Sequence, residues 1–282
     1  MKFATLRTGQ VVALTKEGYR TVDPASMIDV IENYPSELKF SGDPLELPET
    51  LAPPVARPSK IWAAAGNFYR GVNSKDPDGK SSRGEATTLT KEELLHSIFL
   101  KPPSAIIGPG DSIVIPPGAG GVFPEVELCI VIGKRCRGLT VEQAPSAIFG
   151  YSILLDVTAR NYGPEKSGKS MRCIRKGYDT FAPFGPGITT RDEIPHPDRL
   201  QLNLWVNGEL RQSATTETMI NGVYELVSFL SKVCTLEPGD LISTGTPDSP
   251  AHQRKLVDGD TMIAEIEGIG KMKLGIRASD RF

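Results

Sequence analysis

Prolines and glycines constrain the fold of this chain more than any other feature, because they are frequent and spread along its whole length. The 282 residues include 23 prolines and 28 glycines, and neither residue is favourable inside a helix. Short segments rich in apolar and β-branched residues recur between them. We therefore expect a mostly β protein of the α+β class. The main exception is residues 216–233, where apolar residues at helical spacing predict one long amphipathic helix.

A proline-rich stretch near the N-terminus suggests the domain organisation. Prolines cluster between residues 47 and 60, and regular structure does not persist through such a stretch. We therefore expect a small β-rich N-terminal domain over residues 1–50, with a short helix near residues 26–33. Residues 51–60 are then a linker, and residues 61–282 form the main domain. The length of the chain suits this division.

Composition and charge exclude several classes of protein. The net charge is −2, so the sequence gives no sign of a surface for nucleic acid or anionic membranes. No apolar run approaches the length of a membrane span, and the first residues lack the pattern of a signal peptide. The four cysteines lack zinc-site spacing and indicate free thiols in a reducing compartment. We expect a cytoplasmic protein without nucleic-acid or membrane partners.

Two glutamates lie within an otherwise apolar segment, residues 123–133, that is typical of a buried strand. Because strand residues alternate between faces, Glu125 and Glu127 share one face and lie roughly 7 Å apart along the strand. Two buried like charges are costly unless one is protonated or a cation lies between them. A hard divalent cation is the natural partner for such oxygen ligands. On this segment alone, the alternative is an exposed strand edge with two solvated glutamates.

A third carboxylate favours the cation site. Asp156 lies in a second short apolar segment, where an unpaired aspartate would be unfavourable. Lys176 follows, and a cation there is suited to holding a substrate carboxylate or an enolate oxygen. Taken alone, Lys176 is more typical of a surface lysine.

Several segments match one protein family in order and in spacing. They are FLKPPS (99–104), GPGD (108–111), EVE (125–127), GYSILLDVTAR (150–160), KGYDTFAPFGP (176–186), VNGELRQ (206–212), LEPGD (236–240) and TGTP (244–247). On these segments the chain resembles the fumarylacetoacetate hydrolase family, over about residues 61–276.

The resemblance implies a mixed β-roll or sandwich core, usually in a homodimer. It implies Mg²⁺, or Mn²⁺ or Ca²⁺, bound by Glu125, Glu127 and Asp156. It also implies a catalytic role for Lys176. The residues expected to line the pocket or contact the substrate are Tyr69, Arg70, Lys176, Thr180, Gln212 and Thr246.

The implied activity is hydrolysis of a C–C bond in a small oxo-acid of the acylpyruvate or diketo-acid type. Three alternatives use the same site: a 2-oxo-acid decarboxylase, a tautomerase and a dehydratase. A further alternative is a non-catalytic relative that binds metal and acid. Release of two products with uptake of water would distinguish the hydrolase from all of these.

The sequence departs from the family at the usual catalytic histidine of the lid. After the turn at Gly66 and Asn67, position 71 or 72 carries glycine or valine where a histidine is expected. The replacement we predict is Glu93 with His96, three residues apart on a helix that begins with a capping-box pattern at residue 90 and runs to about residue 99. A neighbouring carboxylate would orient the imidazole as a general base. The alternative is a solvated surface histidine beside helix-capping acids.

Overall fold

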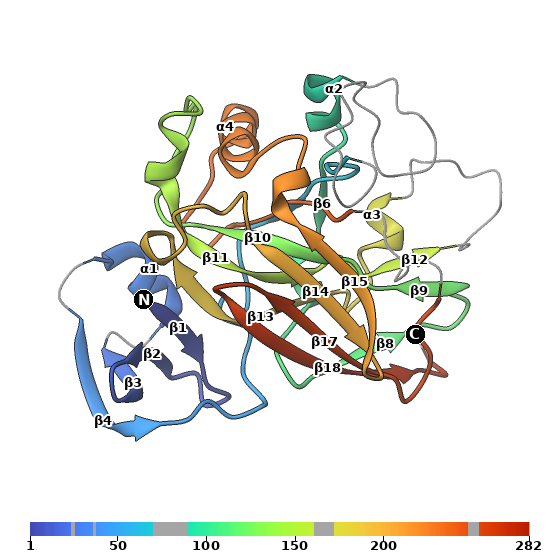
Figure 1. The fold of residues 1–282 in the computed structure, drawn as a ribbon, viewed down its shortest axis with the longest axis horizontal. Coiled ribbons are helices and arrows are strands. Elements are labelled where there is room, and N and C mark those ends of the chain that lie inside the picture. Colours follow the sequence, from blue (N-terminus) through green and yellow to red (C-terminus); the bar gives the residue numbers. More distant parts are fainter. Residues whose placement is uncertain (24–25, 36–37, 70–89, 161–171, 248–253, 282) are drawn as a thin grey trace.

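The chain folds into two mixed β-sheets with short helices around them (Figure 1). The structure, a computed structural model, describes residues 1–23, 26–35, 38–69, 90–160, 172–247 and 254–281. The α-helices in these ranges are α1 (Met27–Asn33), α2 (Lys91–Leu95), α3 (Arg172–Arg175) and α4 (Val223–Val233). Short 3₁₀ turns occupy Pro103–Ala105, Ala144–Ala147, Arg191–Glu193 and Thr216–Thr218. Within the described ranges, no helix combines the length and apolarity that a membrane crossing needs.

The larger sheet runs in the order β4-β3-β2-β1-β13-β11-β10-β16-β5-β6, with β7 beside β13. Its strands are β1 (Lys2–Thr5), β2 (Val11–Thr15), β3 (Gly18–Asp23), β4 (Lys39–Leu45), β5 (Ile61–Ala63), β6 (Phe99–Lys101), β7 (Ile106–Ile107), β10 (Val126–Ile132), β11 (Ile148–Leu155), β13 (Ala182–Thr190) and β16 (Leu241–Ser243). The central strands β10 and β11 are fully buried. The centre of this sheet therefore lies in the interior of the molecule.

The second sheet runs in the order β15-β14-β17-β18-β8. Its strands are β8 (Ser112–Ile115), β14 (Gln201–Val206), β15 (Glu209–Thr215), β17 (Thr261–Ile266) and β18 (Gly270–Ala278). A separate antiparallel pair joins β9 (Gly121–Phe123) to β12 (Thr158–Arg160). The mostly β class predicted from the dispersed prolines and glycines is confirmed.

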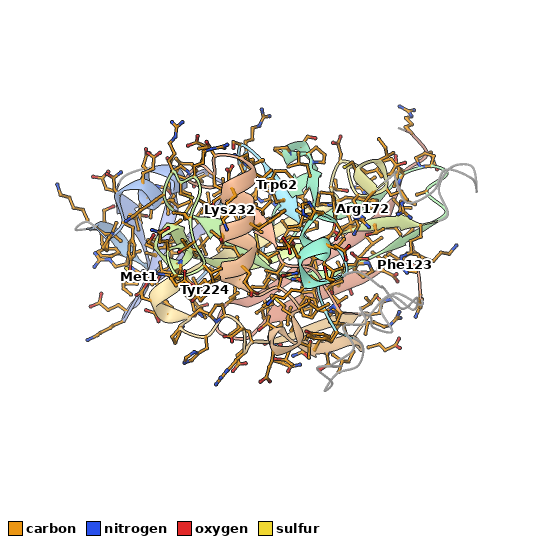
Figure 2. The ribbon with its side chains drawn as sticks, turned by 90° about the horizontal axis from the view of Figure 1, so that it is seen from above. Met1, Trp62, Phe123, Arg172, Tyr224 and Lys232 are labelled. Atoms are coloured by element: carbon orange, nitrogen blue, oxygen red, sulfur yellow. The ribbon has the colours of Figure 1, made fainter. Side chains whose placement is uncertain are left out.

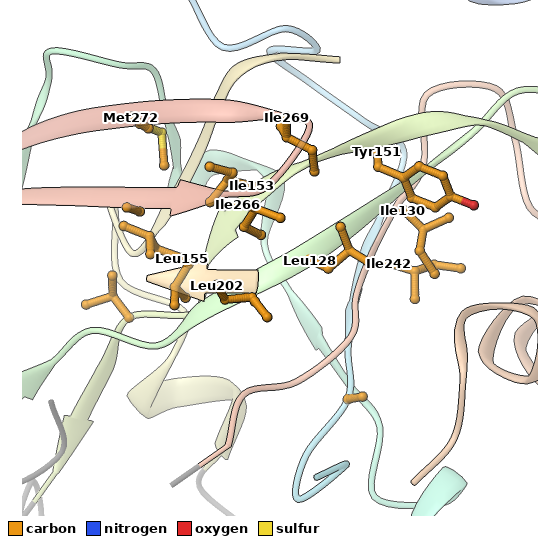
Figure 3. Close-up of a cluster of buried hydrophobic side chains, with 14 of the residues drawn as sticks. Leu128, Ile130, Tyr151, Ile153, Leu155, Leu202, Ile242, Ile266, Ile269 and Met272 are labelled. Atoms are coloured by element: carbon orange, nitrogen blue, oxygen red, sulfur yellow. The ribbon is translucent and has the colours of Figure 1, made fainter. Parts of the chain in front are cut away.

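The main hydrophobic core lies between the two sheets (Figure 3). Leu128 and Ile153 of the larger sheet pack in one cluster with Leu202, Ile266 and Met272 of the smaller sheet. All five side chains are essentially inaccessible to water, and burial of apolar area is the dominant force that holds sheets together in this way. The sandwich-like core expected from the resemblance is present.

The N-terminal strands extend the larger sheet and lie at one end of the molecule (Figure 1). β1 pairs with β13 in antiparallel register, with Phe3 opposite Ile188. Phe3 also shares a second hydrophobic cluster with Cys129 and Val131 of β10. The first fifty residues therefore share core packing with the rest of the chain, while their independence as a domain stays a prediction.

The strand predicted over residues 126–132 has the expected alternation. Val126, Leu128, Ile130 and Ile132 lie in the core between the sheets, whereas Cys129 and Val131 lie in the cluster beneath the N-terminal strands. The strand is thus apolar on both faces at one end. At the other end, the face shared with Cys129 carries Glu127, and this positions the acidic site.

The long helix predicted over residues 216–233 is wrong in its first part. The helix α4 begins only at Val223, after a 3₁₀ turn and a short extended segment. The amides of Ile220 and Asn221 donate to the backbone and side-chain oxygens of Asn67, at 2.8 Å each, so they are not available to a helix. The carboxylate of Glu225 caps the amide of Gly222 at 2.7 Å and fixes the start.

The helix predicted to run from residue 90 to about residue 99 is shorter than expected. Its capping box is present, since Thr90 and Glu93 exchange hydrogen bonds. The helix ends at Leu95, and strand β6 begins four residues later. The short helix predicted near residues 26–33 is confirmed as α1, with Ser26 as its N-cap.

Candidate metal centre

Two neighbouring strands bring the three predicted carboxylates together. Glu125 immediately precedes β10, Glu127 lies within it, and Asp156 directly follows β11. The register pairs Val126 with Leu155, and the amide of Asp156 donates to the carbonyl of Glu125 at 2.9 Å. One carboxylate oxygen from each residue lies within 4.8 Å of the others, and all three side chains are buried. The alternative of solvated glutamates on an exposed edge is therefore wrong.

Two buried lysines face these carboxylates. Lys176 Nζ lies 2.7 Å from Glu125 Oε2, forms an ion pair with Asp156, and donates to Thr158 Oγ1 at 2.6 Å. Lys101 Nζ lies 2.7 Å from Asp156 Oδ1. Both ammonium groups are almost completely buried, so Lys176 is not a surface lysine. Charges withdrawn from water in this way are stable only with close partners of opposite sign.

The carboxylate of Glu127 is held by the last residue of β16 and by the loop that follows it. Ser243 Oγ donates to Glu127 Oε2 at 2.5 Å, and the amide of Gly245 donates to the same oxygen at 2.8 Å. Burial and the charge of Asp156 nevertheless raise the pKa of Glu127 to about 8, against the opposing effect of Lys176. Burial lowers the pKa of Lys101. Burial also opposes the charge of Lys176, but Asp156 and Glu125 raise its pKa overall.

The donor set fits a hard divalent cation. Three carboxylates that converge in a buried site supply only oxygen ligands, which is the preference of Mg²⁺, Mn²⁺ and Ca²⁺. Glu127 remains costly to ionise even with two lysines nearby. Additional positive charge at this position would favour its ionised form.

An arginine lies at the edge of the site. Arg160 of β12 is about one-third exposed, and its guanidinium lies 3.4 Å from Glu125 Oε1 and 4.8 Å from the centre of the Phe123 ring. Phe123 and Arg172 lie toward the same end of the molecule, away from Met1 (Figure 2). The exposed end of the site therefore carries positive charge next to an aromatic surface.

Two of the predicted substrate-binding residues lie together. Gln212 Nε2 donates to Thr246 Oγ1 at 2.9 Å, and both side chains are buried. The other side-chain atom of the amide, Gln212 Oε1, has no hydrogen-bond partner among the described residues. A buried amide with an unused acceptor is suited to a ligand that donates a hydrogen bond.

The remaining predicted substrate contacts are placed differently or lie outside the described residues. Thr180 has a φ of +69°, and its hydroxyl accepts a hydrogen bond from the amide of Val114 at 2.8 Å. Tyr69 pairs through its amide with the carbonyl of Thr218. Arg70 lies outside the described residues. The roles of all of these residues in binding stay predictions.

The predicted Glu93–His96 pair lies on and just after α2. The Glu93 carboxylate accepts a hydrogen bond from the amide of Thr90 at 2.8 Å, and this bond lowers the pKa of Glu93. The His96 ring packs edge-on against Phe229 of α4, with centroids 5.3 Å apart. His96 lines a groove between α2 and α4 whose described lining includes none of the three carboxylates. Its role as a base stays a prediction.

Sequence reasoning missed Lys101 and Ser243 as partners of the site. Lys101 lies in the FLKPPS segment and is a single lysine in a three-residue strand. Ser243 immediately precedes the TGTP segment. The available signal was a charged residue within a short apolar segment, and the same kind of signal singled out Asp156.

A mostly β fold with a buried oxygen-ligand cluster and paired lysines defines an enzyme of the divalent-metal class. The family model described as "Fumarylacetoacetate (FAA) hydrolase C-terminal" matches residues 67–277. The chain belongs to the fumarylacetoacetate hydrolase family.

Characterised relatives cover most of the chain. It is 41% identical over 228 residues to maleylpyruvate hydrolase of Aquipseudomonas alcaligenes, a match covering 81% of this chain and 76% of that protein. It is 37% identical over 225 residues to a mitochondrial oxaloacetate tautomerase of Bos taurus, covering 78% and 67%. The crystal structure of maleylpyruvate hydrolase from Sphingobium sp. SYK-6, in complex with manganese and pyruvate, has a TM-score of 0.78 and 31% identity. That comparison covers 99% of this chain and 100% of the other.

Proposed function

We propose that this protein is a metal-dependent hydrolase that cleaves a C–C bond in an acylpyruvate or related diketo acid. The observation that carries the proposal is the buried cluster of Glu125, Glu127 and Asp156 with two lysine ammonium groups in contact. Similarity to two maleylpyruvate hydrolases, one of them solved with manganese and pyruvate, supports this class of substrate.

The three carboxylates would hold the ion, which we propose to be Mg²⁺, with Mn²⁺ or Ca²⁺ as alternatives. A bound divalent ion would polarise the oxygens of a 2-oxo acid. We further propose a cytoplasmic homodimer. Light scattering at micromolar concentration tests the dimer, because a monomer there would contradict it.

The chain's own side chains supply the remaining functions. Lys176 is the ammonium group in contact with both Glu125 and Asp156, and we propose that it holds negative charge on a substrate oxygen. Lys101 neutralises Asp156 from another direction. Gln212 and Thr246 are proposed to orient the substrate, through the unused amide oxygen of Gln212.

A second candidate is an oxaloacetate tautomerase. The bovine relative supports it, and so does the absence of histidine at positions 71 and 72 of the sequence. Tautomerisation moves a proton between carbon and oxygen and needs no activated water. The Glu93 carboxylate is already bonded to the amide of Thr90, so it is less available to orient His96 as the base that hydrolysis needs. This also favours the tautomerase.

One comparison separates the two candidates. Purified protein, stripped with chelator and reloaded with Mg²⁺ or Mn²⁺, is given maleylpyruvate or acetylpyruvate, and pyruvate release is measured. The same samples are given enolic oxaloacetate, and loss of the enol absorbance is followed. Metal-dependent release of pyruvate supports the hydrolase. Tautomerisation without cleavage of either acylpyruvate would reject the hydrolase in favour of the second candidate.

A further inference from the structure

Asn67 connects three segments that are far apart in the sequence. Its side chain is 2% exposed. The amide nitrogen Nδ2 donates to the carbonyls of Asn221 and Thr244, at 2.9 Å each, and Oδ1 accepts from the amide of Asn221 at 2.8 Å. The side chain therefore uses both donors and an acceptor. A buried amide satisfied in this way is rigid and costly to replace.

One of these bonds reaches the loop that holds Glu127. Asn67 binds the carbonyl of Thr244, and the next residue, Gly245, donates its amide to Glu127 Oε2. The amide of Thr244 in turn donates to the carbonyl of Leu128 at 3.0 Å. The peptide between Thr244 and Gly245 is thus fixed on its carbonyl side by Asn67, and its N–H is directed at the carboxylate.

The fit between Asn67 and Gly245 leaves no spare room. Gly245 has a φ of +90°, and a Cβ added there would lie 3.2 Å from the Cβ of Asn67 and 3.2 Å from the carbonyl oxygen of Ala64. Glycine therefore allows both the left-handed backbone and the close approach. The two residues form a packed contact that determines where the Gly245 amide points.

From these contacts we infer that Asn67 is a positioning residue for Glu127. It acts through the Thr244–Gly245 peptide and has no contact of its own with the Glu127 carboxylate among the described hydrogen bonds. The inference rests on the proposed role of Glu127 as a metal ligand. Groups that orient a ligand typically change metal affinity by tenfold to a hundredfold when removed.

The test compares Asn67→Ala with a matched variant whose contacts involve neither the three carboxylates nor the loop that holds Glu127. Ser231 of α4 is completely buried, and its hydroxyl donates to the carbonyl of Ser228 at 2.8 Å and accepts from the amide of Leu139 at 2.9 Å. Ser231→Ala therefore removes the hydrogen bonds of a buried polar side chain from another part of the scaffold. Mn²⁺ dissociation constants are measured by calorimetry on chelated protein, at a temperature where circular dichroism shows that each variant is folded.

We expect the Mn²⁺ dissociation constant of Asn67→Ala to rise about tenfold or more, and that of Ser231→Ala to stay within about twofold of wild type. We also expect the electron paramagnetic resonance line shape of bound Mn²⁺ to change only in Asn67→Ala, because the orientation of a ligand changes. If Asn67→Ala does not fold, Asn67→Ser, which keeps a hydroxyl donor, is measured in its place, with the same direction expected.

Each remaining outcome is informative. A wild-type protein that binds no Mn²⁺ overturns the proposed function and this inference together. If wild type binds Mn²⁺ and the Asn67 variant binds equally well with an unchanged spectrum, only the positioning role is rejected. Equal weakening in both variants also rejects it, since the effect would then be one of general stability.

Discussion

Lys101 Nζ lies 2.5 Å from the backbone carbonyl oxygen of Lys176, so one buried lysine holds the main chain of the other. The same ammonium group contacts Asp156. Lys101 therefore holds one oxygen of the Asp156 carboxylate and also the main chain of Lys176, whose ammonium group contacts the other oxygen.

We expect Lys101→Met to lower the free energy of unfolding by about 3 kcal/mol, because loss of one partner leaves a buried charge poorly compensated. Chemical denaturation of the chelated protein measures this change. The control is Lys273→Met, which removes an exposed lysine 3.4 Å from Glu49 and should cost no more than about 1 kcal/mol. Equal effects in the two variants would contradict the role assigned to Lys101.

The raised pKa of Glu127 predicts how the stability of the metal-free protein depends on pH. Burial keeps this carboxyl protonated in the folded state up to about pH 8, whereas it ionises near pH 4.5 when unfolded. Between these values the folded state binds more protons, so stability falls as pH rises, by at most about 1.4 kcal/mol per pH unit. Above about pH 8 this contribution levels off.

Denaturation midpoints from pH 5 to pH 9 measure this slope, and Glu127→Gln serves as the comparison. The amide does not ionise, so the variant should lose the part of the slope that Glu127 contributes. Mn²⁺ affinity of the wild type should change in the opposite sense and strengthen up to about pH 8, because the ligand must lose its proton. Identical slopes in wild type and Glu127→Gln would show that another group carries the pH dependence.

Gly245→Ala is expected to weaken both stability and metal binding. The substitution places a Cβ within 3.2 Å of Asn67 and Ala64 in a residue with a φ of +90°, at a cost of about 1–3 kcal/mol. Gly259→Ala is the matched control, because Gly259 has a φ of +82° and open space around the added atom. Gly259→Ala should show the backbone penalty alone, and its Mn²⁺ affinity should equal that of wild type.

The proposed Glu93–His96 pair makes a kinetic prediction. Loss of a general base typically lowers turnover by roughly a hundredfold to ten-thousandfold, so His96→Ala should reduce hydrolysis of an acylpyruvate by that order without changing Mn²⁺ affinity. His196→Ala, a loop histidine between two prolines in the sequence, is the control. Steady-state rates that remain unchanged in His96→Ala would remove the pair from the mechanism.

The features that could be predicted from the amino-acid sequence, such as strand β10 and the candidate ligand Asp156, depend on patterns among neighbouring residues. The alternation in β10 follows from a run of apolar residues interrupted by two glutamates, and it placed Glu127 and Cys129 on one face. Asp156 stood out because it directly follows the apolar run Ile153-Leu154-Leu155. In both cases the signal lies within a few neighbouring residues, and the family resemblance supplied the link between them.

The parts that sequence did not predict depend on contacts between distant segments. Met219 and Ile220 fit the apolar period of α4, but the backbone there is bonded to Asn67, about 150 residues earlier. Lys101 was overlooked because a single lysine in a short strand is usually on the surface, and only the fold places it beside Asp156. Tertiary contacts overrode local preference at both positions.

The hydrogen bond between Gly245 and Glu127 spans 118 residues of sequence, and this has a consequence for synthesis on the ribosome. Strands β10 and β11 are close in sequence and emerge together, so Glu125, Glu127 and Asp156 meet early. The loop after β16 is synthesised well after Asp156. A nascent chain that ends before Ser243 therefore has the acidic ligands but lacks the donors that orient Glu127. We therefore expect high-affinity capture of the ion only after the loop that follows β16 has been synthesised.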